Sequence, residues 1–269
     1  MAALPPGLTD YRLNNGPLFY VLGVLDFEPL LKLGDYIPTI QETLRLVGFP
    51  LIQQAFTSEI TFDGQSVTTN QLPQWAFTTP DHKSAIILTQ SKIAVETVDY
   101  RGFQEFSATL KNALYALRHI PGLIIAQRLG LRYVNAIQPE ADKGFDTVLH
   151  ERLAGVDRFN GLDQLAINMA ISGTSEYGRL TIQVRQAPHG VNAQSDTFML
   201  PPDITPKGPP SIRVDPRRPS RLLDLDHSAL IGEDLNPEGI LELATRLHTA
   251  LDSAFLESIT QDAFDSWIR

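Results

Sequence analysis

Two long amphipathic helical patterns, each preceded by several short β-rich runs, constrain the fold of this chain most strongly. The first runs from Phe103 to about His119. The second opens at Asn236-Pro237, where Asn is a common N-cap residue and Pro fits the first helical turn. Their apolar stripes are Phe103, Phe106, Leu110, Ala113, Leu114 and Leu117, and Ile240, Leu243, Leu247, Leu251, Ala254 and Phe255.

Runs of β-branched and aromatic residues predict the strands. The polar pair Gln90-Ser91 between two such runs predicts a hairpin. Later in the chain, apolar and polar residues alternate from 164 to 185, with a turn expected at Ser172 to Ser175. The expected strands are Leu18–Phe27, Leu51–Phe62, Trp75–Phe77, Ser84–Thr89, Lys92–Val98, Leu123–Ile137, two in the alternating stretch, Thr197–Leu200 and Arg221–Asp226.

The order of these elements predicts an α+β fold, in which antiparallel sheets are each covered by a long amphipathic helix. A short helix is expected near Ile37 to Val47, and Thr260 is expected to cap a last helix. Both halves place strands before one long helix, which favours a pseudo-duplication with halves at 1–140 and 141–269. One continuous domain is the alternative, and the proline-rich stretch 201–219 is expected to be an exposed loop.

Composition narrows the classes of function. The chain has no cysteine, which excludes disulfides and thiolate metal sites. Its start, Met1 to Gly7, lacks the basic and apolar parts of a signal peptide, and its longest apolar run, Leu18 to Leu25, is too short to span a membrane. A cytoplasmic protein with no membrane segment is therefore expected. The net charge of −9 disfavours binding to nucleic acid.

Standard catalytic signatures are missing from the sequence: there is no nucleophile elbow, no phosphate-binding loop, no zinc-protease motif and no dinucleotide-binding glycine pattern. The six histidines are scattered, with no pair at the spacing of a local metal site. No cofactor is expected on this basis.

Asp224, Asp226 and His227 form the most suggestive acidic group. On a strand, Asp224 and Asp226 project from the same face, as ligands of a divalent metal would need to. The alternative is a polar strand edge whose apolar neighbours point inward.

Two groups of basic residues are candidates for ligand binding. In the run from Arg128 to Tyr133, Arg132 is expected to point away from the apolar row of Leu129, Leu131 and Tyr133, with Gly130 leaving room for a ligand. Arg128, Arg132 and Tyr133 are the candidates there, for a carboxylate or phosphate. Arg213, Arg217 and Arg218 in the proline-rich loop could dock an acidic partner or nucleic acid, although no interleaved aromatic residues are present to stack on bases. A salt-bridged strand arginine is the alternative for the first group, and a solvated loop is the alternative for the second.

Several short motifs occur in order along the chain. They are Leu13-Asn14 with Pro17-Leu18, Trp75-x-Phe77, Tyr100-x-x-Phe103-x-x-Phe106, the run Arg128 to Tyr133 followed by Asn135, Leu225-Asp226, and Leu247-His248 leading to Phe255 and Ile259-Thr260. With these motifs the chain resembles a sporadically distributed family of uncharacterised prokaryotic proteins of about this length. The resemblance implies no activity or site; a patchy distribution is typical of accessory roles such as defence or toxin regulation.

The sequence thus favours a binding or adaptor protein for a protein, peptide or small-molecule partner. The alternative is a metal-dependent hydrolase of a phosphorylated or nucleotide substrate, with Asp224, Asp226 and His227 as ligands. The pattern leaves the oligomeric state open.

Overall fold

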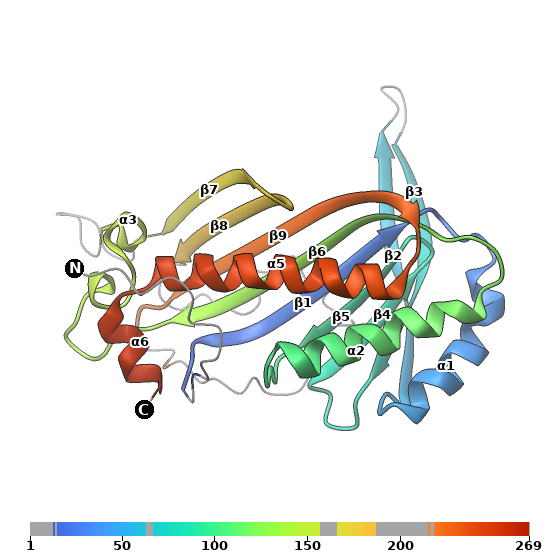
Figure 1. Cartoon of the computed structure of the whole chain (residues 1–269), viewed down its shortest axis with the longest axis horizontal. Helices are drawn as coiled ribbons and strands as arrows, with labels where there is room; N and C mark the ends of the chain where they lie inside the picture. Colours follow the sequence, from blue (N-terminus) through green and yellow to red (C-terminus); the bar gives the residue numbers. More distant parts are fainter. Residues whose placement is uncertain are drawn as a thin grey trace.

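The computed structural model describes residues 13, 15–62, 67–156, 166–186, 215 and 218–268, without the side chains of residues 57–62 and 67–70. Its centre is one antiparallel sheet of nine strands, in the order β2-β3-β4-β5-β1-β6-β9-β8-β7 (Figure 1). The strands are β1 (Leu18–Phe27), β2 (Leu51–Phe62), β3 (Val67–Thr78), β4 (Ser84–Thr89), β5 (Lys92–Thr97), β6 (Ile125–Ile137), β7 (Ile167–Ser175), β8 (Gly178–Gln186) and β9 (Arg221–Asp234).

The described helices include three of ten residues or more: α1 (Ile37–Leu46), α2 (Phe103–Ala116) and α5 (Pro237–Ser258). The shorter ones are η1 (Leu33–Tyr36), η2 (Leu117–His119), η3 (Phe145–Thr147), α3 (Glu151–Ala154) and α6 (Gln261–Ile268). An α+β fold is therefore confirmed. None of these helices is both long and apolar enough to cross a membrane.

Local patterns located most elements correctly. Pro237 opens α5 as predicted, although the Asn236 side chain makes no capping hydrogen bond. Thr260 caps α6, since its Oγ1 accepts a hydrogen bond from the amide of Ala263 at 3.2 Å. The predicted strand Thr197–Leu200 and most of the 201–219 loop lie outside the described residues.

The turn predicted at Ser172 to Ser175 is wrong. Those residues continue β7 and pair with residues 178–181 of β8, and the hairpin turns at Glu176-Tyr177 instead. Gly178 explains the shift, because it has φ of +151° and a Cβ there would collide with the carbonyl oxygen of Ser228 on β9. The predicted turn also contains a glycine, Gly173, but the residue that leaves the actual turn with a positive φ is Gly178.

The strands of both predicted halves form one continuous sheet, a point that the sequence left open. Strand β1 pairs with β5 on one side and with β6 on the other, and β6 also pairs with β9. Because β6 ends at Ile137, before the predicted boundary near residue 140, the halves are joined by the antiparallel pairing of β6 with β9, which runs from Ile125–Asp234 to Ile137–Arg221. The boundary near residue 140 stays a prediction.

The two faces of the sheet differ in what packs on them. Helices α2 and α5 lie along one side, which we call the helix face (Figure 1). Alternate strand residues, such as Leu129 and Leu131 of β6, join helix residues such as Leu110 and Leu247 in the main core. Burying each such side chain stabilises the fold by about 1.5–3 kcal/mol.

The opposite side, which we call the second face, carries two smaller apolar clusters. They contain strand residues and Val98, and no described helix contributes to them. Their buried members are Tyr20, Val98, Val134 and Leu222 in one, and Ala76, Ala85, Ile87 and Ala94 in the other. Arg128 and Arg132 belong to this second face, because strand residues alternate between the two sides.

Gly23 of β1 sets how closely α2 approaches the sheet. A Cβ at this position would lie 3.1 Å from Phe106 of α2 and 3.2 Å from Leu131 of β6. We expect Gly23→Val to lower the free energy of unfolding by about 1–3 kcal/mol through overpacking. Denaturant unfolding checks this, with Gly173→Val as the control, because nothing lies within 4 Å of a Cβ at Gly173. An equal loss of stability in both variants would contradict the packing argument.

Candidate functional site

An ion-pair cluster of Arg132, Asp224 and Arg185 crosses three strands on the second face. Arg132 of β6 donates two hydrogen bonds to Asp224 of β9, from Nε to Oδ1 at 2.9 Å and from Nη2 to Oδ2 at 2.6 Å. Arg185 of β8 adds a third, from Nη2 to Oδ2 at 3.2 Å. The Asp224 side chain is only 6% exposed, so these contacts compensate a buried carboxylate.

The electrostatics of Arg132 follow from this pairing. Burial acts to lower the pKa of the guanidinium, but the hydrogen bonds and charge of Asp224 outweigh it and leave the pKa above its ordinary value. Arg132 thus lies on the predicted side of β6, with Asp224 engaging its Nε and Nη2. It fixes β6 relative to β9.

Arg128 occupies the same face four residues earlier. Its Nη1 lies 3.3 Å from Asp26 of β1, and its Nη2 lies 3.9 Å from Asp226 of β9. The guanidinium folds over Gly130, where an added Cβ would be 3.1 Å from Nη2. The predicted ligand space beside Gly130 is therefore filled by Arg128 itself.

A surface hollow of about 770 Å³ lies beside Arg128. It lies on the second face, at the end of the sheet where β1 and β9 end and where β5 and β6 begin. Leu230, opposite Arg128 in the β6–β9 register, is 86% exposed at its rim. The lining residues are Asp26, Glu28, Ser91, Lys92, Ile125, Gln127, Arg128, Leu230, Ile231 and Gly232.

A buried carboxyl group lies on the same face, on β5. Glu96 is 2% exposed, and its Oε2 accepts a hydrogen bond from the Tyr20 hydroxyl at 2.6 Å. Its other oxygen, Oε1, is buried and has no hydrogen-bond partner among the residues that the structure describes. Burial raises the pKa of Glu96 to about 7, and the hydrogen bond from Tyr20 opposes this only in part.

The three predicted metal ligands are not brought together. Asp224 and Asp226 share the second face as expected, but His227 points to the helix face. There its Nε2 lies 2.6 Å from Ser175 Oγ and its Nδ1 lies 3.3 Å from the Leu247 carbonyl oxygen. Adjacent strand residues point to opposite sides, so Asp226 and His227 cannot converge on one ion. No group of three potential metal ligands occurs within the described ranges.

Tyr133 is likewise separated from the two arginines. It lies on the helix face, 5% exposed, with its hydroxyl 2.9 Å from His248 Nδ1 of α5. The His248 ring stacks on Phe103 at a centroid distance of 4.1 Å, and Tyr100 packs against Tyr133. Burial lowers the pKa of His248 to about 4, so the imidazole is neutral at pH 7. Four residues of the family-like motifs, Tyr100, Phe103, Tyr133 and His248, thus meet as packing between α2, α5 and β6.

The basic loop is only partly described. Arg213 and Arg217 lie outside the described residues. Arg218 donates a hydrogen bond to the carbonyl oxygen of Pro139, and its own carbonyl accepts one from Gln138 Nε2 at 3.3 Å. Arg218 therefore ties this segment to the end of β6.

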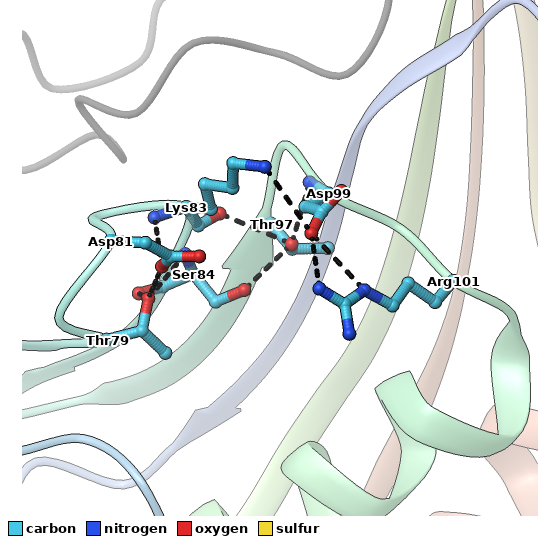
Figure 2. Close-up of polar contacts among 7 residues, drawn as sticks. All are labelled: Thr79, Asp81, Lys83, Ser84, Thr97, Asp99 and Arg101. Atoms are coloured by element: carbon cyan, nitrogen blue, oxygen red, sulfur yellow. Dashed lines mark hydrogen bonds and ion pairs between the residues drawn. The ribbon is translucent and has the colours of Figure 1, made fainter.

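A second polar cluster, away from the hollow, has a structural role (Figure 2). Lys83 and Arg101 both reach Asp99, at 3.7 Å and 2.9 Å from Oδ2. Thr97 Oγ1 accepts hydrogen bonds from Ser84 Oγ and from the amide of Asp99. These contacts join the β3–β4 turn to the segment that leads into α2.

Sequence reasoning missed four polar residues of the second face: Tyr20, Asp26, Glu96 and Arg185. Glu96 carried a usable signal, since it is the one acid within the apolar run of β5. Arg185 and Asp26 carried none, because their importance comes from strands that pair over long sequence separations.

No protein-family model matches the chain, and no curated protein matches it either.

The pKa of Glu96 gives a pH-dependent prediction. Since the folded state holds this proton to about pH 7 while the unfolded chain loses it near 4.5, wild-type stability falls as pH rises through that interval. Glu96→Gln keeps an acceptor for Tyr20 and removes the titration. We expect the stability of this variant relative to wild type to increase by about 3 kcal/mol between pH 4 and pH 8, the equivalent of that pKa difference. Denaturant unfolding at both pH values measures it; a difference that does not change with pH would refute the assignment.

Proposed function

We propose that this chain is a cytoplasmic binding protein that docks a polypeptide partner in the hollow beside Arg128. The observation that carries the proposal is the combination, in one hollow of about 770 Å³, of a half-buried arginine with an exposed leucine. Arginine is enriched among the few residues that carry most of the binding energy of protein interfaces.

The lining of the hollow supports a polypeptide over an anionic polymer. It presents both charge signs, Arg128 and Lys92 beside Asp26 and Glu28, together with the apolar Leu230. A surface of mixed charge complements another protein surface, whereas a nucleic acid would need a concentration of positive charge. The net charge of −9 points the same way.

The ion-pair cluster supports the hollow from within the sheet. Asp224 binds Arg132 and Arg185, and these three side chains connect β6, β9 and β8. A binding surface placed on strands that are cross-linked in this way changes little in shape when a partner arrives.

We further propose that the fold is a pseudo-duplication. If the second half begins at β6, and not near residue 140, the first strand of each half lies beside the last, β1 beside β5 and β6 beside β9, and the remaining strands follow outward. In this interpretation α2 covers the first half and α5 the second. The hollow then lies across the junction of the halves, because β1 and β6 both contribute to it.

The metal-dependent hydrolase gains no support from this geometry, since its three predicted ligands lie on two faces of the sheet.

Arg128→Ala tests the proposal. We expect the tagged chain, purified gently from its own host, to carry a polypeptide partner, and the variant to bind that purified partner about ten-fold more weakly or worse, which is about 1.4 kcal/mol. Calorimetry with the partner measures both dissociation constants. Arg101→Ala is the matched control, because Arg101 also pairs with an aspartate but belongs to the structural cluster of Figure 2.

Two results would count against the proposal: a wild-type chain that carries no polypeptide, or a partner that binds wild type and Arg128→Ala equally. Thermal unfolding of both variants shows that any loss of binding is not a loss of folding.

A further inference from the structure

Strand β2 forms one edge of the described sheet and lacks the prolines, lysines and bulges that often protect an edge. It pairs with β3 alone in the described sheet, over twelve consecutive residue pairs without a bulge. Its sequence contains no lysine, arginine, proline or glycine and a single acid, Glu59. Long, regular edges of this kind offer a row of unpaired backbone groups to another strand, and natural proteins commonly block them with charges, prolines or bulges.

Exposed apolar side chains gather on and beside this edge. Phe56 is 61% exposed, and Ile52 and Leu51 are 41% and 40% exposed. Leu46 and Val47, at the end of α1 just before β2, are 81% and 41% exposed. These five residues fall within eleven positions of the chain, which concentrates apolar surface at one end of the molecule.

We propose that β2 pairs with β2 of a second copy of this chain, so that two nine-stranded sheets join into one. The sequence of the strand favours a second copy as partner, because Leu51 to Phe56 contains no charged residue that would repel its own copy. An axis perpendicular to the sheet places two copies of an edge strand side by side and antiparallel, which continues the antiparallel order of every pair in the sheet.

That symmetry restricts the register. Directly opposed residues of antiparallel strands point to the same face, so one residue must lie opposite its own copy. The longest pairings of the 51–62 strand put residue 56 or residue 57 on the axis. With Phe56 on the axis, the two exposed rings come together on the helix face. Phe56 belongs to that face because it lies two residues after Gln54, which pairs with the core residue Trp75.

Charge is compatible with this arrangement. Each copy carries −9, yet Leu51 to Phe56 contains no charged residue. With Phe56 on the axis, Glu59 falls opposite residue 53 of the second copy, which is Gln, so the two acids do not face each other. The edges therefore meet without like-charge repulsion.

The opposite edge, β7, provides the control. It is shorter, with nine residues, contains Gly173, and exposes one large apolar side chain, Ile171, at 53%. A change from Ile171 to Lys therefore matches a change from Phe56 to Lys in chemistry and in exposure, but at the other edge of the same sheet.

Analytical ultracentrifugation of the full chain tests the proposal. Wild type is expected to sediment as a dimer of twice 29.8 kDa and to dissociate on dilution. Phe56→Lys should raise the dimer dissociation constant about ten-fold or more, since it places two like charges at the axis. Ile171→Lys should leave that constant unchanged.

Amide hydrogen exchange keeps the test decisive if Phe56→Lys fails to fold. In wild type, amides of β2 are expected to exchange more slowly at high than at low protein concentration, whereas those of β7 should not respond. A wild-type chain that is monomeric at all concentrations overturns the proposal. So does a dimer that Ile171→Lys dissociates and Phe56→Lys does not.

Discussion

The antiparallel pairing of β6 with β1 on one side and β9 on the other is the interaction on which the rest of the structure depends. It makes one sheet out of strands that the chain visits far apart, and it fixes which residues of β6 face which side. Leu129 and Leu131 pack into the main core, while Arg128 and Arg132 reach the second face. A register shift by one residue would exchange these sets, burying two guanidinium groups beneath the helices.

The second face combines small apolar clusters with buried polar groups, and these groups differ in how fully they are satisfied. Asp224 receives three charge-assisted hydrogen bonds, so its burial is compensated. Glu96 receives one, and its second oxygen has no donor. A buried ion pair such as that of Asp224 with its arginines is weak evidence for stability, but removing one partner is strongly destabilising because it leaves a buried charge uncompensated. Asp224 is therefore held by charged partners on two neighbouring strands, whereas one oxygen of the buried Glu96 has no donor among the described residues.

Local patterns in the sequence were sufficient to predict most helices and strands, because the formation of these elements depends mainly on residues that are close in sequence. The β4–β5 hairpin and the stripe of α2 agree with the structure since each depends on residues that are close in sequence. The separation of Arg132 from Leu131 and Tyr133 also followed from period-two alternation. The same rule places the neighbours Asp226 and His227 on opposite sides of a strand, so alternation by itself argues against a metal ion shared between them.

The contacts of the ion-pair cluster could not be predicted from the sequence, because they depend on strands that are far apart in the chain and pair in the fold. That Asp224 meets Arg132 depends on β6 lying next to β9, with the two residues 92 positions apart. Arg185 joins them only because β8 follows on the far side of β9. The closure of the space above Gly130 depends on the direction taken by one arginine side chain, Arg128, which no spacing of residues determines.

Site-specific photo-crosslinking tests the central claim, that the hollow beside Arg128 is the binding surface, most directly. A benzophenone amino acid placed at Leu230, which is 86% exposed at the rim of the hollow, should form a covalent adduct with a polypeptide partner in the host cell. The same amino acid at Val156, which is 54% exposed and does not line the hollow, should form none. Adducts of equal yield at both positions, or an adduct at Val156 alone, would contradict the account.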